Sequence, residues 1–462
     1  MPRTEPATEI PIPEHVSFGE ALRVWARIGL LSFGGPAGQI ATMHRELVEK
    51  RRWIDDARFL HALSYCMLLP GPEAQQLATY VGWMLHRTPG ALAAGTLFVL
   101  PGFLALLGLS IAYATLGDLP LVGGLFFGLK CAVLAMVIDA ARRIGLRVLR
   151  TRLLVALALL AFVALFFFDA PFPLVILVAG AIGLGGGALW PDALASAAHA
   201  SSGASVGSLL DRMEARGELE HTRPSIPRAL RVLVTALGLW SVPFVLAWLA
   251  GASPVFLDEA TFFSETAMVT FGGAYAVLAY VAQRAVHDFG WLGPREMVDG
   301  LGLAETTPGP LILVVEFVGF LGAYRSPGAL PPLVAGTLGA VTTAWVTFVP
   351  CFLWILLGGP WVERLRSNRA VRRALSAISA AVVGVIANLS IWFALHVLFA
   401  TVEETHAFWI RLLVPRLDTL DVPALLLSTA AVAAVLGTKL GPFRTLGGAA
   451  AVGLIARGLL GA

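Results

Sequence analysis

The chain contains two copies of one unit. Residues 33–92 align without a gap with residues 271–330 at an offset of 238, and 15 of the 60 pairs are identical. Farther along, the offset becomes 249, which pairs Pro101 with Pro350 and indicates an 11-residue insertion in the second copy. Self-similarity at a fixed spacing is typical of a duplicated structural unit. Any fold proposed for this chain must therefore contain two copies of the same structural unit.

The chain is too apolar for a soluble protein. Apolar residues make up 57% of it and charged residues only 14%, against about 25% charged residues in soluble domains. The net charge of +3 gives no reason to expect a nucleic-acid partner. We expect a polytopic membrane protein in contact with the lipid bilayer. Its candidate spans are the apolar runs near residues 90–116, 119–140, 153–168, 171–189, 229–250, 331–357, 374–400, 423–438 and 442–461.

The nine spans predict how the two copies are oriented. Four spans belong to each copy, and the span at 229–250 lies alone between them. An even number of spans followed by one unpaired span brings the second copy into the membrane from the opposite side. The predicted fold is therefore an all-α polytopic membrane protein with two inverted-topology repeats, at 17–189 and 258–461, joined by one central helix.

Arginine positions predict which side is cytoplasmic, because short cytoplasmic loops collect Lys and Arg. The loop at 141–152 holds five arginines, whereas the loops at 117–120, 169–173 and 251–257 hold no basic residue. This threading places the polar tail 1–16 and the polar linker 190–228 in the cytoplasm. The tail has no apolar segment of the kind found in cleavable signals. Segment 401–422 is placed outside although it carries Arg411 and Arg416.

Each copy also contains two helices that glycine and proline interrupt. Residues 17–50 and 56–86 have helical patterns on both sides of their breaks, and neither half alone is long enough to cross a bilayer. These sequences cannot continue an α-helix, because proline lacks an N–H donor and glycine adds backbone freedom. We expect re-entrant hairpins, which keep the basic residues at 45–52 on the cytoplasmic side. The breaks are Phe33-Gly34-Gly35, Pro70-Gly71-Pro72, Phe271-Gly272-Gly273 and Pro308-Gly309-Pro310.

The four breaks predict an anion site. Broken helices at membrane depth are tolerated only where protein or a watery cavity surrounds them. The second half-helix after each break, beginning near Pro36, Pro72, Ala274 and Pro310, directs free N–H groups and a positive dipole end at the break. Many secondary transporters bind substrate in this way between inverted repeats. The alternative for any single break is a kink or a close-packing site.

Several side chains are further candidates. Gln75, Gln76 and Thr79 follow the first Pro-Gly-Pro and offer neutral donors to an anion, whereas the second copy has apolar residues there. Lys130 lies inside an apolar run, where it complements an anion or extends its amine to the membrane surface. Candidates for proton coupling are Glu73, Glu305 and Glu316, whose alternative is a packing or helix-end role.

The remaining polar residues are expected to form local ion pairs or to lie at the membrane surface and in loops. Asp139 is expected to pair with Arg142 or Arg143 near the membrane surface, and His44, His61 and His86 are expected to be interfacial or loop residues.

The motifs resemble the chromate ion transporter family in its long two-domain form. The resemblance rests on FGGPAGQIA and LPGPEAQQLATYVGW in the first half and on FGGAYAVLAYVAQ and AETTPGPLILVVEFVGF in the second, and it covers residues 17 to 455. It implies a secondary carrier that exports chromate, a tetrahedral dianion like sulfate, across the cytoplasmic membrane of a bacterium. Other oxyanions remain alternative substrates, and a homodimer remains open.

Other function classes have less support. The sequence has no HExxH or GxSxG motif and no Cys/His pairing, and Cys66, Cys131 and Cys351 stand apart in apolar surroundings. We therefore expect no catalytic residues, no metal and no cofactor. A channel would normally be a symmetric oligomer around one pore. A lipid-carrier transporter or flippase remains the rival, since re-entrant hairpins serve such proteins as well.

Overall fold

The computed structural model is mostly helical and describes residues 13–33, 35–116, 120–186, 207–271, 274–361, 369–407, 410–437 and 442–459. In the first half the helices are α1 (Phe18–Leu31), α2 (Gly35–His44), α3 (Asp56–Cys66), α4 (Glu73–Leu116), α5 (Pro120–Val148), α6 (Arg152–Phe168) and α7 (Phe172–Gly185). A connecting part follows with α8 (Leu209–Ala215), α9 (Ile226–Trp240) and α10 (Val242–Leu249). Part of the predicted linker is therefore helical.

The second half repeats the pattern of the first. Its helices are α11 (Pro254–Val269), α12 (Ala274–Gln283), α13 (Pro294–Thr306), α14 (Val314–Arg325), α15 (Pro332–Gly358), α17 (Arg369–Leu398), α18 (Val422–Gly437) and α19 (Pro442–Gly453). A short π-helix continues α2 at Arg45–Glu49 and, at the matching place, α12 at Arg284–Asp288.

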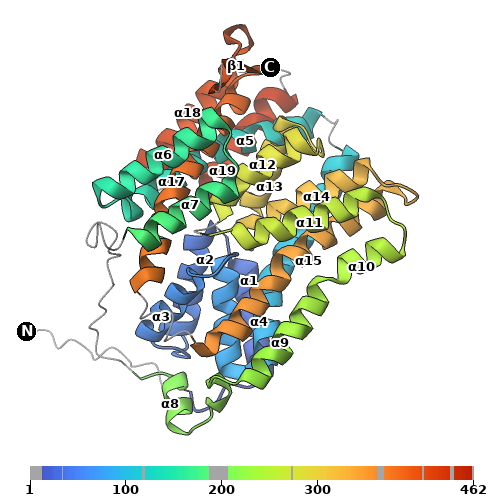
Figure 1. Cartoon of the computed structure of the whole chain (residues 1–462). Coiled ribbons are helices and arrows are strands. Elements are labelled where there is room, and N and C mark those ends of the chain that lie inside the picture. Colours follow the sequence, from blue (N-terminus) through green and yellow to red (C-terminus); the bar gives the residue numbers. More distant parts are fainter. Residues whose placement is uncertain are drawn as a thin grey trace, which may run out of the picture.

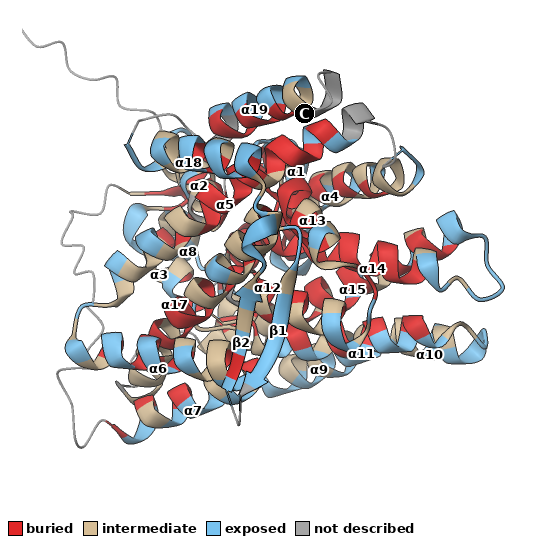
Figure 2. Ribbon diagram, turned by 90° about the horizontal axis from the view of Figure 1, so that it is seen from above, coloured by how far each residue is buried: buried red, intermediate tan, exposed pale blue. Residues whose placement is uncertain are grey.

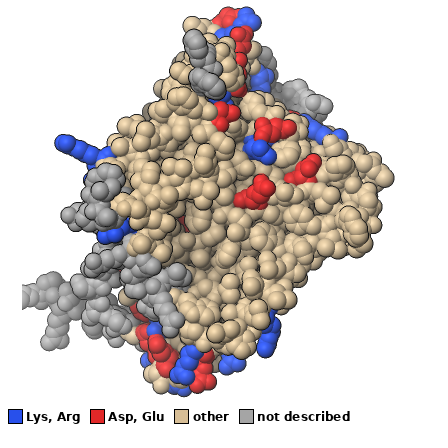
Figure 3. All heavy atoms as spheres, viewed as in Figure 1, with Lys and Arg blue, Asp and Glu red and all other residues tan. Residues whose placement is uncertain are grey.

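The apolar helices agree with the predicted spans. Five helical segments in the described part are long and apolar enough to cross a membrane, namely Glu73–Leu116, Gly123–Val148, Ile226–Leu249, Pro332–Trp361 and Arg373–Leu398. Four shorter apolar helices fall on the other predicted spans. Buried residues concentrate along α13, α14 and α15, while the outer helix α9 has no buried residue (Figure 2). Most charged side chains on the face shown in Figure 3 gather around α8 and in the upper part, with a broad uncharged surface between them.

The long helices of the two halves pack against each other reciprocally. Helices α4 and α15 lie side by side, and α17 contacts α6 and α7 (Figure 1). Helix α5, which corresponds to α17, contacts α18 and α19, which correspond to α6 and α7. Each half thus completes the packing of the other.

The helix breaks occur where the sequence predicts them. Helix α1 ends at Leu31 and α2 begins at Gly35, while α3 ends at Cys66 and α4 begins at Glu73. In the second half α11 ends at Val269, and α13 ends at Thr306 before a 3₁₀ turn leads into α14. Gly34, Gly272 and Gly273 lie outside the described residues.

The predicted central span is present as Ile226–Leu249, but it carries a local break that the sequence analysis does not predict. It is divided at Ser241 into α9 and α10, because Pro243 has no N–H to donate to the Leu239 carbonyl four residues earlier. The Trp345 indole of α15 donates to that carbonyl at 2.7 Å. A hydrogen bond from the second half therefore replaces the one that proline removes.

Segment 401–422 contains an antiparallel hairpin that the sequence analysis does not predict. Strand β1 (Val402–Ala407) pairs with β2 (Ile410–Pro415). Its two arginines, the exceptions in the arginine pattern, are both paired: Arg411 Nη1 lies 2.9 Å from Asp169 Oδ1, and Arg416 Nη2 lies 3.0 Å from Asp418 Oδ2. Local carboxylates thus offset their charge.

The other polar residues with expected ordinary roles have local partners. Arg143 Nε lies 2.8 Å from Asp139 Oδ2, as predicted. His44 contacts Glu49 and Asp56, and the Nε2 atom of His86 lies 2.9 Å from the Val16 carbonyl oxygen.

Glu46, which follows α2 outside the apolar spans, provides a test of the fold. Its buried carboxylate accepts from Lys50 at 2.7 Å and also pairs with Arg51. Burial raises the pKa of Glu46, and the hydrogen bonds from Lys50 and Arg51 outweigh that effect, so its pKa lies below the ordinary value. The stabilisation is therefore present above the unfolded pKa and is lost as pH falls through the folded pKa.

We expect Glu46→Gln to lower the free energy of unfolding by about 1–3 kcal/mol near neutral pH, because it leaves Arg51 without its carboxylate. The midpoint of thermal unfolding of the detergent-purified protein at pH 7 and at pH 4 measures this, with the exposed Glu49→Gln as control. Equal midpoints for wild type and Glu46→Gln at pH 7 would contradict the assignment.

Candidate functional site

Two hydrogen bonds tie the breaks of the two halves together. The Gly71 amide donates to the Thr270 carbonyl at 2.8 Å, and the Gly309 amide donates to the Ser32 carbonyl at 2.7 Å. Gly71 corresponds to Gly309 and Ser32 to Thr270 at the offset of 238. Each Pro-Gly-Pro break therefore contacts the residue just before the Phe-Gly-Gly break of the other half.

Glycine is required at both Pro-Gly-Pro corners. Gly71 has φ +114° and Gly309 has φ +92°, a region that L side chains rarely adopt. A methyl group built on Gly71 would lie 2.8 Å from Cys351 Sγ of α15, while one built on Gly309 would lie 3.6 Å from the Cα atom of Gly102 on α4. Cys351 and Gly102 correspond at the offset of 249. Each corner thus packs on the same point of the other half's long helix.

A tyrosine brings the two Phe-Gly-Gly breaks together. The Tyr275 hydroxyl donates to Glu305 Oε1 at 2.5 Å. A methyl group built on Gly35, which has φ +69°, would lie 3.8 Å from the same hydroxyl oxygen. With the two backbone bonds, this contact joins all four breaks into one polar cluster, which we name the break cluster.

Glutamines line the break cluster from the first half. Gln39 Nε2 donates to the Gly309 carbonyl at 2.6 Å, and Gln76 Nε2 donates to the Pro70 carbonyl at 2.7 Å. Gln75 Nε2 lies 3.2 Å from Thr79 Oγ1. All four side chains are buried. Sequence reasoning missed Gln39 as a candidate, although it stands in the apolar half-helix four residues after Gly35.

Two of these glutamines have unused hydrogen-bonding capacity. The Oε1 atoms of Gln75 and Gln76 are buried without a partner, which costs about 1–3 kcal/mol for a polar group. Gln75 Nε2 donates one N–H to the Thr79 hydroxyl oxygen, whose own proton is donated to the Gln75 backbone carbonyl at 2.9 Å. The Gln75 amide therefore keeps one N–H donor that it can offer to an anion.

The helix ends add further donors. The first N–H groups of a helix have no acceptor within it, and the positive dipole end favours a negative charge. Glu73, partly buried, opens α4 directly after Pro72. An anion at this helix end would compete with the Glu73 carboxylate for the same positive end of the dipole.

Buried carboxylates mark the second half. Glu316 on α14 has no hydrogen-bond partner for either carboxyl oxygen among the described residues. Glu259 on α11 was not predicted, because nothing near it in sequence marks it. Its carboxyl packs between α14 and α15, so close that methyl groups built on Gly322 and Gly339 would lie 2.9 and 3.0 Å from its oxygens. The first half has alanines, Ala78 and Ala21, at the corresponding positions.

Lys130 lies apart from the break cluster. It lines a small cavity with Arg295, His396, Val397, Phe399, Ala400 and Asp421, and its amine lies 5.4 Å from the centre of the Phe127 ring. None of these residues belongs to a break. In the part of the chain that is described, no group of three His, Cys, Asp or Glu side chains could hold a metal ion.

Comparison with known proteins gives one consistent result. The family model described as "Chromate transporter" matches residues 19–184 and 257–454. A "Chromate transport protein" of Cupriavidus metallidurans is 27% identical over 461 residues, which cover 99% of this chain and 98% of that protein. Another from Pseudomonas aeruginosa is 30% identical over 83% of each chain. A "Probable chromate transport protein" of Synechococcus elongatus is 26% identical over 80% of this chain and 83% of its own. No solved structure matches this chain.

The two corners can be tested by their glycines. We expect Gly71→Ala and Gly309→Ala each to destabilise the protein by about 1–3 kcal/mol, because alanine is strained at these φ values. Gly108→Ala is the matched control, since a methyl group there meets nothing within 4 Å. Thermal unfolding of the detergent-purified variants measures the effect. Corner variants as stable as Gly108→Ala would show that the corners relax freely.

Proposed function

Because the chain belongs to the chromate transporter family, we propose that it is a secondary carrier that exports chromate across the cytoplasmic membrane of a bacterium. Family membership supports ion transport, and the relatives are named as transport proteins rather than enzymes. The proposed substrate is a small tetrahedral dianion, and sulfate is an anion of the same shape. The observation that supports the location of its site best is the reciprocal pair of bonds from Gly71 and Gly309.

Neutral donors suit a carrier of a dianion. Helix N-termini and amide groups bind an oxyanion through many N–H contacts without a fixed positive charge. A buried arginine or lysine would hold a dianion strongly in the low dielectric of the membrane, and release would then be slow. Gln39, Gln75, Gln76 and Thr79 supply such neutral groups beside the corners. The proposed site therefore binds a dianion and still releases it.

We further propose that the two halves have inverted topology and that the broken helices re-enter the membrane from opposite sides, with the N-terminus in the cytoplasm. The reciprocal packing of α17 on α6 and α7, and of α5 on α18 and α19, supports a two-fold relation between the halves. In such an arrangement a rocking motion of one half against the other exposes the break cluster to each side in turn.

Proton movement is the proposed source of energy. Glu305 lies in the break cluster through Tyr275, and Glu316 and Glu259 are buried in the same half without an ion pair among the described residues. Carboxylates inside a membrane protein are costly when charged, so they mark functional sites by default. We propose that Glu305, with Glu73, Glu316 and Glu259, carries protons that balance the charge of the oxyanion.

Flux of the anion tests the function directly. We expect proteoliposomes that contain the purified protein to take up radiolabelled chromate or sulfate, and a proton gradient to change the rate. Protein-free liposomes control for leakage, and a fluorescent lipid in the same vesicles tests the flippase rival. Lipid movement without any anion flux would contradict the proposal.

Substitution of Gln75 tests the proposed anion-binding site. We expect Gln75→Leu, which installs the residue of the second half at this position, to raise KM at least tenfold, because a hydrogen bond to a charged group contributes about 1.5–3 kcal/mol. Gln283→Leu is the matched control, since Gln283 bonds to Asp169 and has no contact with a break. Equal KM values in the two variants would move the binding site away from α4.

A further inference from the structure

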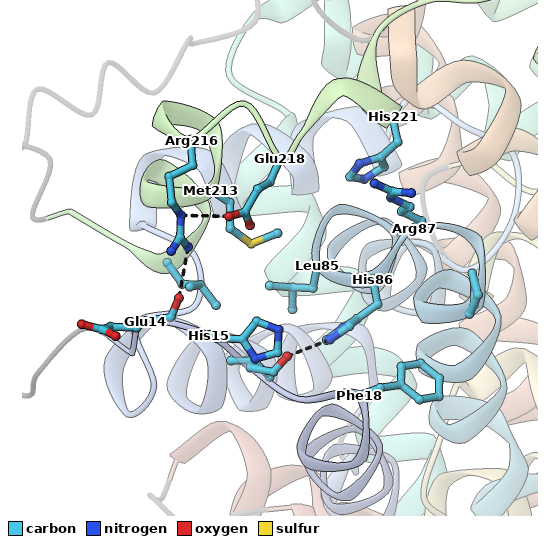
Figure 4. A pocket seen from close by; sticks show the side chains of 13 residues that line it. Glu14, His15, Phe18, Leu85, His86, Arg87, Met213, Arg216, Glu218 and His221 are labelled. Atoms are coloured by element: carbon cyan, nitrogen blue, oxygen red, sulfur yellow. Dashed lines mark hydrogen bonds and ion pairs between the residues drawn. The ribbon is translucent and has the colours of Figure 1, made fainter.

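A second polar site lies at the end of the molecule where the described N-terminal segment meets α8. A cavity of about 500 Å³ opens between three distant segments: the residues before α1, the kink of α4, and α8 with the turn that follows it. Figure 4 shows His15, His86, Arg87 and His221 around it. Its other lining residues are Glu14, Val16, Phe18, Leu85, Pro89, Leu209, Met213, Arg216 and Glu218.

Arg87 is the free positive charge of this cavity. It forms no ion pair or hydrogen bond with any residue that the structure describes, and its side chain is exposed. Arg216 is different, because its Nε atom lies 3.0 Å from Glu218 Oε1 and is neutralised there. The Glu14 carboxylate points away from the cavity (Figure 4). The charge inside the cavity is therefore positive.

In the second half, the arginine that corresponds to Arg87 does have a carboxylate partner. Arg325, the counterpart of Arg87, donates to both oxygens of Glu296, at 2.5 and 2.9 Å. The counterpart of Glu296 in the first half is Arg58, which instead pairs with Glu214 and Asp211 of α8. The first half therefore has the arginine but lacks the carboxylate that pairs with it in the second half. The residue at the position of that carboxylate, Arg58, is paired with acidic residues of α8.

The backbone at Arg87 is also unusual. It has φ 54° and ψ −150°, in the middle of the segment that joins the two parts of α4. Such a conformation costs about 1–3 kcal/mol in a residue with a side chain and is found most often at functional sites. The strained backbone holds the guanidinium beside His221, as Figure 4 shows.

Two imidazoles present unused nitrogen atoms. The Nε2 atoms of His86 and His221 lie 2.9 and 3.0 Å from the carbonyl oxygens of Val16 and Trp83, which makes Nε2 the donor in each ring. Both Nδ1 atoms are buried without a partner. Burial, together with the nearby charges of Arg87 and Arg228, lowers the pKa of His221. An anion bound beside Arg87 would offset the positive charge of its guanidinium group.

We propose that this cavity is a docking site for the oxyanion, separate from the break cluster, in which the Arg87 guanidinium binds a hydrated tetrahedral dianion before it enters the transport site. The proposal rests on the proposed function, which places this end of the molecule in the cytoplasm. A free guanidinium in a concave site raises the local anion concentration and the association rate. The cavity is larger than a bare oxyanion, which leaves room for its water.

Protection of a cysteine from alkylation tests the docking site. Met213→Cys places a thiol in the cavity, and the three native cysteines are buried. In phosphatidylcholine nanodiscs we expect sulfate to slow maleimide labelling of Met213→Cys at least threefold. Adding Arg87→Gln should abolish this protection, Arg87→Lys should retain part of it, and the exposed Arg23→Gln on α1 should retain all of it. Protection that survives Arg87→Gln would overturn the proposal.

Two further arms separate the sources of failure. Gln75→Leu should leave the sulfate protection of Met213→Cys intact, so its loss of transport and the Arg87 result are independent. Protection by phosphatidylglycerol nanodiscs without sulfate would assign the cavity to a lipid headgroup and would overturn docking of the free anion. Transport by Arg87→Gln should fall most at low substrate and low salt, because salt screens the attraction that Arg87 supplies, while the maximal rate remains.

Discussion

The two backbone hydrogen bonds from Gly71 and Gly309 hold the structure's centre together. Each joins a break in one half to a break in the other, and each requires a glycine with positive φ. A broken helix in a membrane leaves amide and carbonyl groups that lipid cannot satisfy. Here the breaks of one half satisfy those of the other, which explains why neither half could form this centre alone.

The halves have kept the same scaffold and diverged in its polar groups. The first contributes Gln39, Gln75, Gln76 and Thr79, while the second has buried carboxylates at Glu305, Glu316 and Glu259. Neutral amides suit an anion, and protonatable carboxyls suit a proton. In the proposed carrier, the first copy supplies most of the neutral donors and the second copy, together with Glu73, supplies the proton carriers. The two copies are in contact through the hydrogen bond from Gln39 to the Gly309 carbonyl.

Local chemistry made much of the fold predictable. Glycine and proline fix where α1, α3, α11 and α13 end, and apolar length fixes the helices that follow. The division at Ser241 was visible in Pro243 but was not predicted, because its partner Trp345 lies about a hundred residues away. The sequence does not predict the pairing of β1 with β2, because the arginines in this segment serve there only as topology signals.

The candidate site was less predictable, because side-chain partners depend on how helices rotate and pack. Gln39 was missed since its acceptor, Gly309, lies 270 residues away. Lys130 was a candidate from its apolar surroundings, yet the rotation of α5 directs it to a cavity with Arg295 and Asp421. Arg87 aligns with Arg325 at the offset of 238, whereas the loss of its carboxylate partner becomes visible only in the structure, where Arg325 pairs with Glu296.

In the proposed carrier, the Pro-Gly-Pro corners of both halves enclose one oxyanion. Cryo-electron microscopy of the protein in nanodiscs, with and without chromate, tests it most directly. We expect a difference density between Gly71 and Gly309, within hydrogen-bond distance of Gln75 or Gln76. Chromate density only elsewhere in the protein, or corners that face lipid acyl chains, would contradict it.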